Sequence, residues 1–331
     1  MSNSFTRERI VRMKPLVVMA ALALAGLAMP SKSDAAVFAD GTDLQAVKDE
    51  GLKLSASNNG PAASVLFYTS GGEYLFHGAG FYLTSPDGIN RTLITAGHCI
   101  FDALAADPNA YAIIVNGTNA YSDSGPEIRV DASNMLLGPG CDGSLNKLDI
   151  GALTLSTAAP VTGQFVIGGK PYYGQQVVTV GAGLVLTRTQ AKNGTWEPWD
   201  GGLNMFEGLF ADKYNNFLVM NLFFEGESPY AGASISGDSG GVVILPSSIL
   251  FDEDGRVEYC EIVGVNVGHT YSTNFYDASS SLYTALYDHN SVAYQFVMDA
   301  ISASRSIPEP STLGIGVLGA VGLLLRRNQR S

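Results

Sequence analysis

Gly237-Asp238-Ser239-Gly240-Gly241 is the stretch of this sequence that predicts most about its fold and chemistry. Glycines on both sides of Ser239 allow the backbone to approach another group closely and to adopt φ and ψ values that are closed to other residues. A serine hydroxyl is a weak nucleophile at neutral pH. It becomes effective when an imidazole accepts its proton and backbone N–H groups bind the resulting oxyanion. The stretch therefore predicts a reactive serine that needs a histidine partner.

His98 is the predicted base. The chain has 4 histidines, so few rivals exist for this role: His77, His98, His269 and His289. His98 lies in Leu93-Ile94-Thr95-Ala96-Gly97-His98-Cys99, where an apolar run typical of a strand leads into a turn of small residues. This position places the imidazole at the end of a rigid element.

Asp149 is the candidate for a third partner. It lies in Leu148-Asp149-Ile150-Gly151-Ala152-Leu153, with apolar residues on both sides. An ionised carboxylate in such a run is costly to bury unless a group pairs with it, and an imidazole N–H is a suitable pair. The pattern predicts that Asp149 orients His98.

These segments together resemble the trypsin-like (chymotrypsin-fold, S1-type) serine proteases. Residues 95–99 match that family's T-A-A-H-C, residues 149–153 match D-I-A-L-L, and residues 237–241 match G-D-S-G-G. Val180-Gly181-Ala182-Gly183 is similar to the family's G-W-G turn. The order of histidine, aspartate and serine is that of the chymotrypsin arrangement, and the resemblance covers roughly residues 60–301.

The resemblance implies a secreted serine endopeptidase that hydrolyses peptide bonds through an acyl-enzyme. In that role His98 is general base and then acid, Asp149 orients it, Ser239 attacks, and the N–H groups of Gly237 and Ser239 form the oxyanion hole. No cofactor or metal is expected, and the expected partner is a protein or peptide substrate. The alternative is a catalytically silent homologue that acts as an envelope or extracellular-matrix binding protein.

The implied fold is all-β, with two six-stranded antiparallel β-barrels and a C-terminal helix, over residues 61–304. Short apolar runs between turn signals agree with an all-β interpretation. The runs are residues 64–68, 80–83, 91–95, 112–115, 176–180, 217–224, 241–245 and 261–267. Residues 291–301 shift to helical spacing, which predicts the C-terminal helix. Residues 37–60 are expected to be either a pro-segment or an extension packed on the barrels, with one amphipathic helix over 40–56.

Residues 1–36 have the pattern of a secretory signal peptide. Basic residues are followed by an apolar run over 16–29 and then by Ser33-Asp34-Ala35-Ala36, a small-residue cleavage site. The other interpretation of this segment is a permanent N-terminal anchor.

Residues 305–331 resemble the PEP-CTERM sorting signal of Gram-negative bacteria. Pro308-Glu309-Pro310 matches the motif, residues 312–325 are apolar, and residues 326–331 are basic. The apolar run is shorter than the roughly 20 residues that cross a hydrocarbon core. The resemblance implies processing by an exosortase-type enzyme, transient membrane contact through this segment, and release to the cell surface or matrix. The alternative is an ordinary C-terminal anchor.

Composition restricts the possible partners and leaves the cysteine pairing open. The formal net charge of −12 argues against a nucleic-acid partner, and we expect a monomer. The odd count of three cysteines, Cys99, Cys141 and Cys260, predicts one disulfide and one free thiol in an oxidising compartment. Residues 76–80, where the family carries the partner of the cysteine after the catalytic histidine, contain none.

The specificity pocket is inferred from the resemblance. The residue six before the nucleophile, Ala233, corresponds to the base of the family's primary pocket, with Ser234 beside it and Val267 and His269 in its wall. No acid lies there, so a strong preference for Lys or Arg is not expected. An apolar or small side chain is one expectation. Glutamate bound by His269 or Ser234 is the other, because histidine can become charged to meet a carboxylate.

Overall fold

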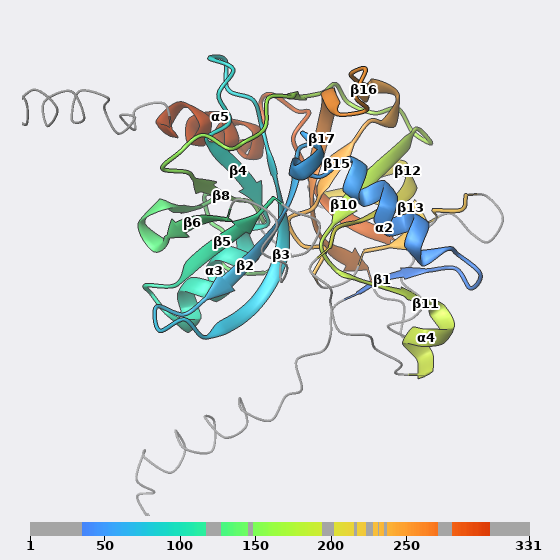
Figure 1. Ribbon diagram of the computed structural model, residues 1–331, viewed down its shortest axis with the longest axis horizontal. Helices are drawn as coiled ribbons and strands as arrows, with labels where there is room; N and C mark the ends of the chain where they lie inside the picture. The colour runs from blue at the N-terminus through green and yellow to red at the C-terminus, as the bar shows by residue number, and fades with distance from the viewer. Residues whose placement is uncertain are drawn as a thin grey trace, which may run out of the picture. The chain divides into compact units, whose positions relative to one another are not determined.

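The computed structural model describes residues 35–116, 127–144, 148–193, 202–214, 217–222, 228–230, 232–234, 237–270 and 280–304. The expected signal peptide, except Ala35 and Ala36, and the expected sorting signal lie outside these residues. The described residues belong to one unit, which begins at Asp34. They are mostly β-strands, as the sequence predicts (Figure 1).

The first sheet has seven strands and is nearly closed. Its order is β6-β5-β2-β3-β4-β8-β7, and every neighbouring pair is antiparallel. The strands are β2 (Ala62–Tyr68), β3 (Tyr74–Tyr82), β4 (Thr92–Thr95), β5 (Tyr111–Val115), β6 (Glu127–Asp131), β7 (Met135–Leu137) and β8 (Gly151–Thr154). Thr95 at the end of β4 pairs with Gly151 at the start of β8. This pairing brings the segments before His98 and after Asp149 side by side.

The second sheet has eight strands. Its order is β15-β10-β12-β13-β18-β17-β16, β9 adds to β17, and a further pairing of β15 with β17 returns the path to its start. The strands are β9 (Gln164–Ile167), β10 (Gln176–Gly181), β12 (Asn204–Tyr214), β13 (Phe217–Leu222), β15 (Val242–Ile244), β16 (Leu250–Phe251), β17 (Val257–Thr270) and β18 (Ser280–Ala285). The strand counts of the two sheets thus differ from the expected six and six, because short strands such as β7, β9 and β16 extend each sheet.

Apolar strand residues form the core. Phe81 of the first sheet and Phe165 of the second are both fully buried in one continuous cluster. Burial of each such side chain contributes about 1.5–3 kcal/mol. The cluster includes Ala79 and Ile94 next to the site described below, so the strands that carry the site are held by core packing.

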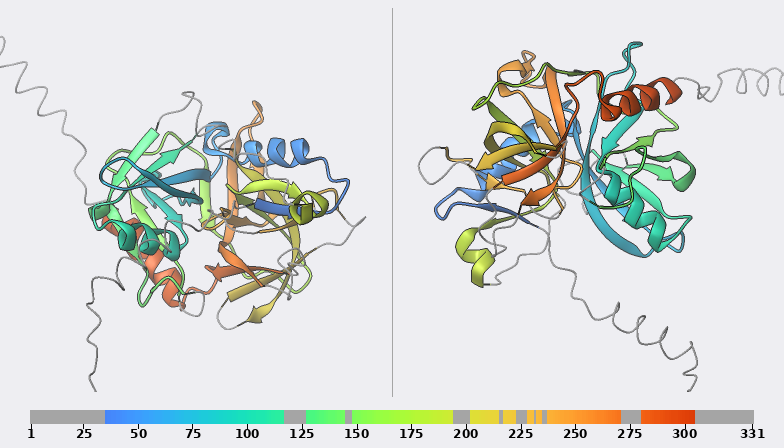
Figure 2. Two further views of the ribbon diagram at one scale, coloured as in Figure 1. Left: turned by 90° about the horizontal axis from the view of Figure 1, so that it is seen from below. Right: turned by 180° about the vertical axis from the view of Figure 1, so that it is seen from behind.

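Four α-helices accompany the sheets in the described residues: α2 (Leu44–Lys53), α3 (Gly97–Ala106), α4 (Arg188–Asn193) and α5 (Val292–Ser304). The predicted C-terminal helix is confirmed as α5, which lies beside β4 and β8 of the first sheet (Figure 2). The small residues after β4 form the first turn of α3, whereas the sequence predicts only a turn there. Within the described residues, no helix is long and apolar enough to span a membrane.

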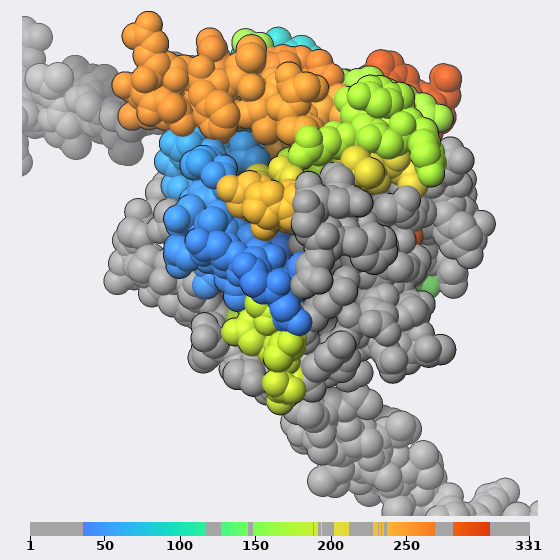
Figure 3. Space-filling view, turned by 90° about the vertical axis from the view of Figure 1, so that its right-hand side faces the viewer, coloured from blue at the N-terminus to red at the C-terminus, as the bar shows by residue number. Residues whose placement is uncertain are grey.

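The N-terminal segment packs on the second sheet. A third, small sheet has the order β11-β1-β14, in which β1 (Ala35–Phe38) lies between β11 (Leu184–Thr187) and β14 (Gly232–Ala233). The expected helix over 40–56 is shorter, because Asp43 caps α2 by accepting hydrogen bonds from the backbone of Gln45 and Ala46. Asn58 and Asn59 donate to the carbonyls of Gly255 and Val257, so this segment lies next to the β16–β17 hairpin (Figure 3).

Candidate active site

His98 and Asp149 form the best-defined part of the site. His98 lies in the first turn of α3, and Asp149 lies two residues before β8. His98 Nδ1 is 2.7 Å from Asp149 Oδ2, and the backbone N–H of His98 donates to Asp149 Oδ1 at 2.7 Å. Asp149 is 1% exposed, and its carbonyl accepts from Thr284 Oγ1 of β18. The carboxylate therefore has the buried partner that its apolar surroundings require.

The surroundings of His98 favour its charged form. Burial lowers the pKa of His98, but the charge and hydrogen bonding of Cys99 and Asp149 outweigh this effect and raise the pKa well above 6.5. Because Asp149 accepts at Nδ1, the neutral imidazole carries its hydrogen on Nδ1 and leaves Nε2 as a proton acceptor.

Ser239 lies on a tight loop that is anchored to both sheets. Its carbonyl accepts from the backbone of Ala79 in β3 at 2.8 Å, and the next residue, Gly240, donates to the carbonyl of Asn266 in β17 at 2.7 Å. Gly240 has φ of 87°, and a Cβ there would collide with the Ala79 carbonyl and with Thr95. Only glycine fits this approach, which explains one glycine of the opening motif.

Asp238, the residue before Ser239, is held in the interior. It is fully buried, and its Oδ1 accepts from Gly183 N–H at 2.8 Å and from Asn204 Nδ2 at 2.9 Å. The Asp238 carbonyl accepts from Asn266 Nδ2 at 2.7 Å. A Cβ on Gly181 or Gly183 would meet the Asp238 carboxylate, so the sequence similar to G-W-G makes room for it. These hydrogen bonds fix the backbone conformation next to Ser239.

The two backbone N–H groups expected to bind an oxyanion are those of Gly237 and Ser239. Gly237 has φ of 91°, a conformation that favours glycine. Among the described residues, neither N–H donates a hydrogen bond to another protein group. Within the part of the chain that the structure describes, both N–H groups are thus open to a ligand.

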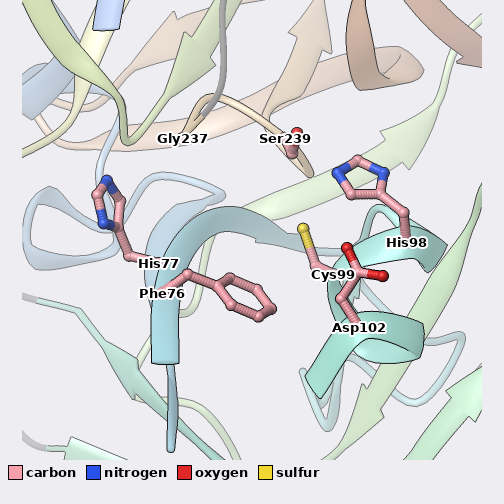
Figure 4. Close-up of a pocket in the computed structure, with 7 residues that line it drawn as sticks. All are labelled: Phe76, His77, His98, Cys99, Asp102, Gly237 and Ser239. Atoms are coloured by element: carbon pink, nitrogen blue, oxygen red, sulfur yellow. The ribbon is translucent and has the colours of Figure 1, made fainter. Parts of the chain in front are cut away.

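Ser239, His98 and Gly237 line one cavity of about 190 Å³, together with Phe76, His77, Cys99 and Asp102. Figure 4 shows a ring nitrogen of His98 directed toward Ser239. No hydrogen bond joins these two side chains in the described part of the chain. Such contacts are often loose before substrate binds and tighten in the complex.

Of the expected specificity residues, Ser234 and Val267 are the two whose side chains the structure describes, and neither lines this cavity. Ser234 is fully buried, and its hydroxyl lies within hydrogen-bonding distance of Asn266 Oδ1 and the Gly268 carbonyl. Val267 is 1% exposed and belongs to the core, next to an irregularity in the β17–β18 pairing. The backbone of Ala233 pairs with Val37, and that of His269 pairs with Ser281. The structure does not describe the side chains of Ala233 and His269.

The expected disulfide is wrong. Cys99, Cys141 and Cys260 are all free thiols. Cys99 Sγ faces Gly78 of β3, where a Cβ would lie 3.3 Å from the sulfur, so the strand opposite Cys99 offers no second cysteine. Cys260 is fully buried on β17, and burial raises the pKa of its thiol.

Two residues of the site escape a motif search. Asn204 on β12 and Asn266 on β17 hold Asp238, yet neither belongs to a segment that the resemblance identifies as functional. A weak signal exists for Asn266, since it is an isolated amide in the apolar run Val263-Gly264-Val265-Asn266-Val267. A polar side chain inside a buried strand is unusual unless it is hydrogen-bonded.

Comparison with known proteins supports the interpretation of the C-terminus. Residues 306–329 match the model of the PEP-CTERM protein-sorting motif. No curated protein matches the chain. The motif is typical of exported proteins that an exosortase-type enzyme processes at the membrane, so the comparison indicates an exported protein of a Gram-negative type of sorting system.

Proposed function

We propose that this protein is an exported serine endopeptidase with a chymotrypsin-like fold, in which the seven-stranded and eight-stranded sheets are the two barrels. The observation that carries the proposal is the 2.7 Å contact between His98 Nδ1 and Asp149 Oδ2 at a cavity that Ser239 also lines. A buried aspartate on one ring nitrogen leaves the other nitrogen free to act on a serine.

The residues support the following reaction. His98 Nε2 accepts the proton of Ser239 as its oxygen attacks a peptide carbonyl, and Asp149 stabilises the imidazolium that forms. The N–H groups of Gly237 and Ser239 bind the oxyanion. His98 then gives the proton to the leaving amine, and a water molecule, activated by the same imidazole, hydrolyses the acyl-enzyme.

The location of the mature protein is also a proposal. The PEP-CTERM segment directs the chain to the inner membrane, where processing near Pro308-Glu309-Pro310 releases a monomeric enzyme to the cell surface or extracellular matrix. The basic residues after the apolar run stay on the cytoplasmic side until that step.

A fluorophosphonate probe tests the activity. We expect the purified protein to form a covalent adduct at Ser239 and to hydrolyse casein, and we expect Ser239→Ala to do neither while remaining folded. The loss in kcat is roughly six orders of magnitude, because the nucleophile and its base act as one unit. Wild-type protein that is folded but neither labelled nor active would instead favour a silent homologue with a binding role.

A further inference from the structure

The cavity beside Ser239 has an apolar wall and an acidic wall. The Phe76 ring stacks on Phe67 with 5.0 Å between ring centroids, so its position is fixed. Asp102 is an exposed residue four positions after His98, hence one turn further along α3. Figure 4 shows the Phe76 ring and the Asp102 side chain extending from β3 and α3 toward the same space.

The negative charge of the acidic wall is opposed in part by His98. In the described part of the chain, no lysine or arginine forms an ion pair with Asp102. Burial lowers the pKa of His77 to about 4, so its ring is neutral at physiological pH. The Asp149 carboxylate is bound to His98. Partial burial raises the pKa of Asp102, and together with the nearby Asp149 charge it outweighs the opposite effect of the His98 charge.

The position of the cavity indicates which part of a substrate it receives. In the proposed reaction His98 protonates the leaving amine, so the residues after the cut must lie beside this ring. Cys99 and Asp102 follow His98 on α3, whereas Ser234, which precedes Ser239 in the sequence, is fully buried and does not line the cavity. The cavity therefore lies on the leaving-group side of the serine.

We propose that this cavity selects lysine or arginine at one of the first two substrate positions after the scissile bond, with Asp102 as the partner of the cation and Phe76 in contact with its aliphatic stem. This inference rests on the proposed function. Lysine and arginine combine a long apolar stem with a charged end, which matches the two walls. The volume of about 190 Å³ is below the roughly 300–1,000 Å³ of pockets for whole small molecules, so a single side chain is the fitting occupant.

The overall charge favours the same class of substrate. The chain has a formal net charge of −12, and a field of this sign attracts cationic peptides before they dock. Arginine is expected to bind better than lysine, because its planar guanidinium can contact both oxygens of a carboxylate.

The test compares peptides that differ only after the cut. Digestion of a random-sequence peptide library by the purified full chain, read by mass spectrometry, first identifies a preferred acyl-side sequence. Matched peptides then carry arginine, glutamine or glutamate at the first or second position after the cut. We expect arginine to exceed glutamate about tenfold in kcat/KM, a typical effect of one charge-assisted contact.

Variants test whether the arginine-to-glutamate ratio in kcat/KM depends on the Asp102 carboxylate. Asp102→Asn should bring the arginine-to-glutamate ratio close to one, and Asp102→Lys should invert it. Glu253→Gln is the matched control, because it makes the same change in net charge at an exposed residue that does not line the cavity, and it should retain the wild-type ratio.

The outcomes separate this inference from the proposed function. If the wild-type protein is labelled by fluorophosphonate and cuts the library without preference for a cation after the cut, the subsite is wrong and the protease activity stands. The same holds if the arginine preference survives Asp102→Asn. If the protein is neither labelled nor able to cut any peptide, both proposals are overturned.

Discussion

Asn204 offers the sharpest test of how the structure holds Ser239, the proposed nucleophile. Its Nδ2 donates to Asp238 Oδ1 at 2.9 Å and to the Gly183 carbonyl at 3.0 Å, and its own Oδ1 is buried without a partner among the described residues. Both Nδ2 hydrogens of Asn204 are donated and its oxygen has no partner there. The amide therefore takes the orientation that serves the Asp238 carboxylate. Rotation of the amide would turn its oxygen toward Asp238 instead.

The size of the effect follows from these two bonds. A hydrogen bond to a charged group contributes about 1.5–3 kcal/mol and a neutral one about 0.5–1.5 kcal/mol, so Asn204→Ala should lower the free energy of unfolding by about 2–4.5 kcal/mol. If about 1.4 kcal/mol of that loss acts on the conformation of the loop that carries Ser239, kcat/KM falls about tenfold.

Two measurements on each variant separate positioning from stability. Urea unfolding gives the change in stability, and hydrolysis of a peptide substrate well below the unfolding transition gives kcat and KM. Asn90→Ala is the matched control, because Asn90 is also buried and donates from Nδ2 to a carbonyl, that of Val161 at 3.0 Å, but it does not contact the Ser239 loop. We expect both variants to lose stability and only Asn204→Ala to lose kcat. Wild-type kcat in Asn204→Ala would refute the positioning role.

Other outcomes follow from the same site. Asp149→Asn should lower kcat about 10⁴-fold without loss of fold, because the imidazole would adopt the wrong tautomer; activity within tenfold of wild type would contradict the assignment. Activity should rise with pH through the raised pKa of His98, since only the neutral ring accepts a proton, so kcat/KM should still be increasing above pH 6.5; a maximum near pH 4 would point to another mechanism. Dialysis against a chelator should leave peptide hydrolysis unchanged, and loss restored by a metal would contradict this. Intact mass of the exported protein should show a chain that ends near Pro308-Glu309-Pro310, whereas a mature species with Arg326 would oppose processing there.

Local patterns in the sequence predict the strands well and their pairing poorly. The run at 112–115 lies within β5, and the run at 176–180 lies within β10. Each is a short apolar segment between turns, so its identity depends on neighbours in the sequence. The parallel pairing of β1 with β11 and of β9 with β17 depends on contacts between distant segments, and the sequence pattern contains no sign of them.

The cysteines show why the cysteine count alone does not predict disulfide pairing correctly. An odd count in an exported protein favours one bridge, but pairing requires two cysteines whose Cα atoms lie within about 7 Å and face each other. Gly78 stands opposite Cys99, and Cys260 is buried between β9 and β16 on β17. The count of cysteines carries no information on these positions.

The hold on Asp238 bears on whether the proposed enzyme needs an activation step. In the family that the motifs resemble, a new N-terminus made by cleavage pairs with the aspartate before the nucleophile. Here the N–H of Gly183, two residues after β10, and the amide of Asn204, at the start of β12, already bind that carboxylate in the uncut chain. Pairing of β10 with β12 brings both donors into position. The loop around Ser239 is therefore expected to reach its conformation on folding, without a cleavage step. The uncut chain, with residues 37–60 packed beside the second sheet, is therefore expected to react with a fluorophosphonate.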